Sequence, residues 1–69
     1  MDTSTDISYL QDIQYDERVK IIATMLDTLL TMSNDGNSMA MKLLGDYYEE
    51  QKDYEKMKKY YQAAIEKGN

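Results

Sequence analysis

The sequence lacks several residue types on which small proteins often depend. Its 69 residues include no cysteine and no histidine, so neither a disulfide bond nor a zinc site of the usual kind is available. Nucleophilic catalysis based on histidine or cysteine is excluded for the same reason. A domain of this length is near the lower size limit for a self-sufficient core, so a partner chain or a second copy remains as an external source of stability. We expect no cofactor and no enzymatic activity.

Long hydrophobic runs are also missing. The apolar stretches are only a few residues long, whereas a membrane-spanning helix needs about 20. Residues 1–20 have no basic start followed by an apolar run, so no signal peptide is predicted. The absence of cysteine fits a reducing compartment. We therefore expect an intracellular, cytoplasmic protein that does not associate with membranes.

The net charge of −5 is unevenly distributed. Residues 1–35 carry seven acids and two bases (−5), and residues 36–69 carry six of each (0). No basic patch is available to bind phosphates, so nucleic acid is not an expected partner. The acidic half is interpreted either as a solubilising end or as a docking surface for a basic partner.

The pattern of apolar residues predicts an all-α fold. Proline is absent, only three glycines occur, and apolar residues recur at intervals of three and four. We predict a disordered segment at 1–5 and one helical domain at 6–69, with helices near 6–14, 16–33, 38–51 and 53–67. The expected N-caps are Asp16, Asn37 or Ser38, and Asp53. Gly36 is the expected left-handed cap between the second and third helices.

Gly45 lies inside a predicted helix, where glycine costs about 1 kcal/mol relative to alanine. Two helices can approach closely where one of them has no side chain. We therefore predict that Gly45 accommodates the last helix near Met57 or Tyr61.

The C-terminal half resembles a known helical repeat. Leu44-Gly45 followed by Tyr48, and then Met57, Tyr61 and Ala64, fall at the offsets of a tetratricopeptide repeat. Ala40, four residues before Leu44, makes the segment similar to Sel-one-like repeats as well. The resemblance covers residues 36–69 and implies an antiparallel helical hairpin that binds proteins without catalysis. The composition is similar to that of divergent repeats in large DNA viruses and some protists.

The chain departs from the repeat pattern at two positions. Met41 stands where an aromatic residue is common, and Met57 where the family usually has a small one. A shift of 32 residues aligns Gly36-Asn37 with Gly68-Asn69. This alignment makes the predicted 16–33 helix similar to the second helix of a degenerate earlier repeat, and repeats of this kind stack on one another.

The resemblance also implies candidate binding residues. In such repeats the first helix lines a concave groove, which here corresponds to Met39, Lys42, Asp46, Glu49 and Glu50. That face is mostly acidic, so the expected ligand is a peptide bearing lysine or arginine. An acid/base pair formed by Asp46 with Glu49 or Glu50 is a weaker interpretation, because exposed helical acids are usually solvated charges.

Two other functions stay open. The protein could be a self-associating structural homo-oligomer whose exposed ends pair through Tyr54, Tyr60 and Ile65. It could also be an acidic inhibitor or regulator that uses residues 1–17 against a basic target.

Overall fold

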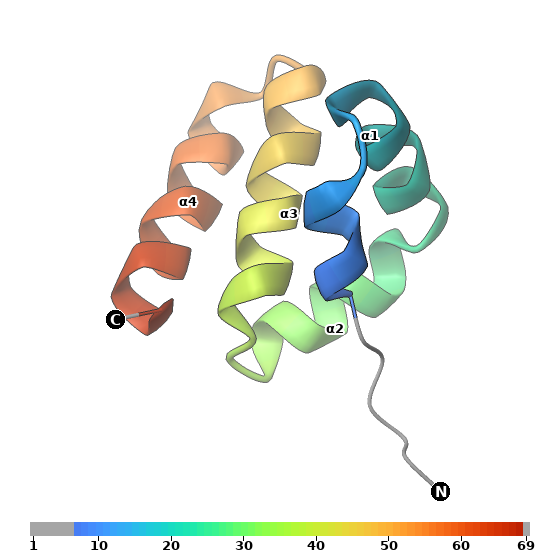
Figure 1. The fold of residues 1–69 in the computed structure, drawn as a ribbon. Helices are drawn as coiled ribbons and strands as arrows, with labels where there is room; N and C mark the ends of the chain where they lie inside the picture. Colours follow the sequence, from blue (N-terminus) through green and yellow to red (C-terminus); the bar gives the residue numbers. More distant parts are fainter. Residues whose placement is uncertain (1–6, 69) are drawn as a thin grey trace, which may run out of the picture.

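A computed structural model describes residues 7–68, and within this range the regular elements are all helices (Figure 1). They are the 3-10 helix η1 (Ser8–Asp12) and the α-helices α1 (Tyr15–Thr24), α2 (Leu26–Asn34), α3 (Ser38–Glu50) and α4 (Tyr54–Gly68). The predicted all-α fold is therefore confirmed. The prediction of disorder at 1–5 lies outside the described residues.

Two of the three predicted N-caps are confirmed. Asn37 Oδ1 accepts a hydrogen bond from the backbone N–H of Ala40 at 3.0 Å, and Asp53 Oδ1 accepts one from Lys56 at 3.3 Å. The prediction for Asp16 is wrong, because α1 already begins at Tyr15 and the preceding residue makes no side-chain cap. Asp16 instead lies in the first turn of α1, where its charge suits the helix dipole.

The helices α2 and α3 end in the same hydrogen-bonded motif. After α2, Gly36 has a φ of 96°, and Asn37 N–H reaches back to the Met32 carbonyl at 3.0 Å. After α3, Lys52 has a φ of 62°, and Asp53 N–H bonds the Tyr48 carbonyl at 2.9 Å. Both are Schellman-type ends, which require a residue in the left-handed region. The cap at Gly36 was predicted; the one at Lys52 was not.

The predicted helix over 16–33 is wrong in one respect, because it is broken at Met25. Met25 has φ −123° and ψ 32°, and its N–H bonds the carbonyl of Ile22 at 3.1 Å, a three-residue step that tightens the backbone. Ile22 and Leu29 lie on either side of the break, and both are fully buried. These two residues would also share a face in a straight helix, so the apolar spacing contains no sign of the bend. Of the helix predicted over 6–14, the described residues 7–14 form only the short η1.

The core lies around α3, which Figure 1 shows between α4 on one side and η1, α1 and α2 on the other. The largest fully buried side chains come from η1, α1, α2 and α3: Leu10, Ile22, Leu29, Leu43 and Leu44. No residue of α4 is buried. The helix α4 therefore forms an edge layer, which covers α3 with one face and leaves the other open.

Candidate functional site

The contact between α3 and α4 depends on Gly45. A Cβ added at this position would overlap the ring of Tyr61, which packs directly on the glycine backbone. This confirms the predicted reason for a glycine inside the helix and identifies Tyr61, not Met57, as the contacting residue. The close approach brings the Tyr61 side chain down onto α3.

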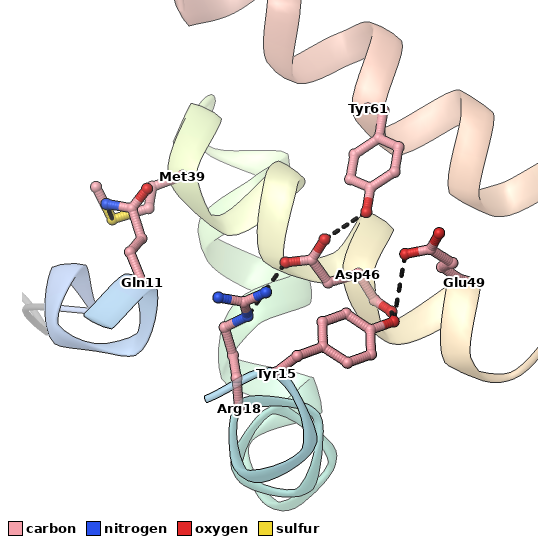
Figure 2. A network of polar contacts seen from close by, with 7 residues as sticks. All are labelled: Gln11, Tyr15, Arg18, Met39, Asp46, Glu49 and Tyr61. Atoms are coloured by element: carbon pink, nitrogen blue, oxygen red, sulfur yellow. Dashed lines mark hydrogen bonds and ion pairs between the residues drawn. The ribbon is translucent and has the colours of Figure 1, made fainter. Parts of the chain in front are cut away.

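The next residue, Asp46, connects three helices (Figure 2). It is only 7% exposed. The Tyr61 hydroxyl from α4 donates a hydrogen bond to its Oδ1, and Nε of Arg18 from α1 lies 3.3 Å from its Oδ2. The Arg18 Nε–H is not directed at an acceptor, so this contact is an ion pair rather than an aligned hydrogen bond. Asp46 thus holds both α1 and α4 against α3.

Tyr15 adds a second link between α1 and α3. Its hydroxyl lies 3.2 Å from both the Asp46 backbone carbonyl oxygen and Glu49 Oε1, and it donates its one hydrogen between them. The Arg18 guanidinium lies 5.4 Å from the centre of the Tyr15 ring, within the range of a cation–π contact. Burial and then the nearby Glu49 carboxylate raise the pKa of Tyr15 to about 12. Burial and the hydrogen bond to Asp46 raise the pKa of Tyr61 above its ordinary 10.0.

An open hollow of about 620 Å³ lies beside this network, between η1, α3 and α4. Its walls are mostly apolar. Figure 2 shows Gln11 of η1 reaching Met39 of α3, and both residues belong to the lining. The Gln11 amide nitrogen lies 3.7 Å from the Met39 sulfur. The residues that line the hollow are Gln11, Ser38, Met39, Lys42, Asp46, Tyr61, Ala64, Ile65 and Gly68.

The five residues predicted to form a groove on α3 separate into two groups. Met39, Lys42 and Asp46 line the hollow. Glu49 is exposed outside the lining and receives the Tyr15 hydrogen bond, and Glu50 is exposed beyond it. The expectation that Asp46 lies on an exposed face is wrong, because Arg18 and Tyr61 cover its carboxylate. The hollow is consequently less acidic than the sequence indicated.

Of the three residues predicted for self-association, two are open and one is packed. Tyr54 and Ile65 on α4 are 53% and 64% exposed. Tyr60 is half-buried and stacks on Tyr48, with ring centres 5.6 Å apart and planes 11° from parallel. Ile65 also lines the hollow.

The α4 side of the hollow was not identified as a ligand-facing wall in the sequence. Ala64 was identified only as a position of the repeat pattern, and Gln11 was not identified at all. The packing of α4 on α3 and the contact of Gln11 with Met39 bring them to one site. In the sequence, only the small side chains at Ala64 and Gly68 indicate that this part of the last helix leaves space.

Within residues 7–68, no group of three or more acidic side chains is placed to hold a metal ion. In the same part of the chain no helix has both the length and the apolar character that crossing a bilayer requires. Comparison with protein-family models, with curated proteins and with solved structures gave no match to the chain.

Proposed function

We propose that this protein is a non-catalytic interaction module that binds a segment of another protein in the hollow between η1, α3 and α4. The observation that carries the proposal is the hollow itself, which is open, mostly apolar and built from three separate helical elements. Concave apolar sites with a few polar groups are the usual form of binding sites. The one carboxylate in the lining, Asp46, is bound by Arg18 and Tyr61, so the hollow itself has no pair of free acids.

The relation to tetratricopeptide-like repeats is part of the same proposal. It is supported by the antiparallel pairing of α3 and α4, in which Ser38 lies near Gly68 at one end and Tyr48 stacks on Tyr60 toward the other. It is also supported by the glycine-on-tyrosine contact between Gly45 and Tyr61. In this proposal α3 supplies the floor of the binding face and α4 one wall.

A display selection of random peptides against the folded 69-residue chain tests the proposal. We expect enriched peptides whose affinity falls at least about tenfold for Ile65→Glu, because the change puts a charge into an apolar wall at a position that is already 64% exposed. Tyr9→Glu is the matched control: Tyr9 is 50% exposed but does not line the hollow. Selected peptides that bind Ile65→Glu as tightly as the unchanged chain would refute the site.

A second candidate function, self-association, is favoured by the open face of α4. This helix has no buried residue and exposes Tyr54 and Ile65, which a second copy could cover. Light scattering over a wide concentration range tests it. Self-association predicts a mass above the 8.1 kDa of one chain. In the double variant Tyr54→Glu/Ile65→Glu the mass should return to 8.1 kDa. A single-chain mass at every concentration contradicts it.

A further inference from the structure

We propose that the segment bound in the hollow is acidic: an amphipathic helix with an apolar row and carboxylates beside it. This inference rests on the proposed function and adds the chemistry of the partner. The ligand charge proposed here is opposite to the one expected from the sequence, because the acidic residues of α3 predicted a peptide bearing lysine or arginine.

The charges that line the hollow give the first reason. Only Lys42 and Asp46 among the lining residues carry a charge. The Asp46 carboxylate is balanced by Arg18 at 3.3 Å and hydrogen-bonded by Tyr61, so it offers little to a ligand. Lys42 is exposed and forms no ion pair with the described residues. The charge left for a ligand is therefore the positive one on Lys42.

The charge of α4, which forms one wall, gives the second reason. This helix carries two glutamates and four lysines, which gives it a net charge of +2, whereas residues 7–53 carry nine acids and four bases and have a net charge of −5. One of the four lysines, Lys56, is already paired with Asp53 at 3.8 Å. The other three, Lys58, Lys59 and Lys67, form no ion pair with described residues. Lys59 and Lys67 line a separate hollow beside α2, and none of the three lines the proposed site. The α4 residues that line the proposed site carry no acid, so this wall does not oppose a negative ligand.

The charge of the whole chain acts in the opposite direction and has to be weighed. A net charge of −5 repels an acidic ligand at long range. At physiological ionic strength, however, exposed charges are screened beyond about 8 Å. The charged groups next to the ligand therefore determine whether it is attracted or repelled. Glu49 and Glu50 lie outside the lining, toward the α3 end far from Ser38. We expect the acids of the ligand to lie at the Lys42 end of the hollow.

The apolar residues of the lining determine the apolar side of the ligand. Met39 on α3 and Ala64 and Ile65 on α4 face the same hollow. An amphipathic helix enters such a groove with apolar residues at i, i+3 or i+4, and i+7, so its charged positions lie at the rim. Lys42, which is exposed at the edge of the floor, is placed to meet a carboxylate there.

Two synthetic helical peptides test the inference. They share one leucine row and differ only in whether the remaining positions are glutamate or lysine. Isothermal titration calorimetry on the full chain, at an ionic strength of about 0.15 M, measures each affinity. We expect the glutamate peptide to bind at least about tenfold more tightly, and Lys42→Glu to remove or reverse this preference. Lys20→Glu is the matched control, because Lys20 is an exposed lysine on α1 that does not line the hollow.

The other outcomes separate this inference from the proposed function. Equal or tighter binding of the lysine peptide would overturn the inference and leave the binding function standing. A glutamate preference that persists in Lys42→Glu would overturn it too, since the carboxylates would then be recognised elsewhere. If neither peptide binds while display-selected peptides do, only the inference fails; if nothing binds by either route, both fail.

Discussion

At the scale of single residues, the contact between Gly45 and Tyr61 determines how closely α4 can approach α3. The Tyr61 ring lies on the glycine, and its hydroxyl bonds the carboxylate of the following residue, Asp46. One aromatic side chain thus provides both an apolar and a polar contact across the same helix pair. Because α4 has no buried residue, partly buried contacts such as this one and the Tyr48–Tyr60 stack hold it on α3.

Gly45→Ala tests the packing. Helix propensity alone predicts a gain of about 1 kcal/mol from this change, whereas overpacking a well-filled contact costs about 1–3 kcal/mol. The added Cβ would overlap the Tyr61 ring, so we expect a net loss of stability, measured by urea unfolding. Tyr61→Ala in the same chain should remove the clash, so that Gly45→Ala becomes neutral or stabilising there. A stabilising Gly45→Ala in the otherwise unchanged chain would contradict the contact.

The raised pKa values of Tyr15 and Tyr61 predict a loss of stability at alkaline pH. The unfolded chain releases each hydroxyl proton near the ordinary tyrosine pKa of 10.0, whereas folded Tyr15 keeps its proton to a pKa of about 12. Between these values the unfolded state binds fewer protons than the folded state, so the free energy of unfolding falls as pH rises from 10.0 to about 12.

Denaturant unfolding over this pH range measures the effect. Lysines lose their charge in the same pH range and also change the stability. The test is therefore the difference in pH dependence between each variant and the unchanged chain. Tyr15→Phe and Tyr61→Phe should each reduce the decrease in the free energy of unfolding as the pH rises. Tyr9→Phe, which removes an exposed hydroxyl, should leave it unchanged. Equal slopes in all four chains would contradict the proposed burial of these hydroxyls.

At the scale of the elements, the ends of the helices show which local features the sequence could predict. Asn37 and Asp53 act through their own side chains on the next turn, and Gly36 is the residue best suited to a positive φ, so each was visible in the sequence. Lys52 occupies the same left-handed position without being glycine. The break at Met25 involves no glycine or proline, so neither feature had a local signal.

Lys52→Gly should stabilise the protein. A side chain in the left-handed region costs about 1–2 kcal/mol, and part of this gain is offset by the greater freedom of glycine in the unfolded chain. We therefore expect a rise of about 1 kcal/mol or less in the free energy of unfolding, measured by urea unfolding. Lys52→Ala is the control, because it removes the same charge but keeps the Cβ. A gain in Lys52→Ala equal to that in Lys52→Gly would assign the effect to charge and contradict the backbone account.

At the scale of the whole molecule, the candidate site arises only when distant segments meet. The hollow takes its lining from η1, α3 and α4, and the charge of Asp46 is cancelled by Arg18, which lies 28 positions earlier in the chain. The resemblance to helical repeats implied Met39, Lys42 and Asp46 as neighbours on one face of a helix, and all three line the hollow. It could not show that α1 returns to cover Asp46, and for that reason the ligand charge expected from the sequence differs from the one we propose.

Chemical-shift mapping of the full chain by nuclear magnetic resonance tests the central claim, that a partner binds in the hollow. The probe is the glutamate peptide, or a display-selected peptide if that binds more tightly. We predict that the largest shift changes fall on Met39, Lys42, Ala64 and Ile65. Changes centred instead on the acidic residues of α1 and α2, such as Asp16 and Asp27, would contradict the account and point to binding outside the hollow.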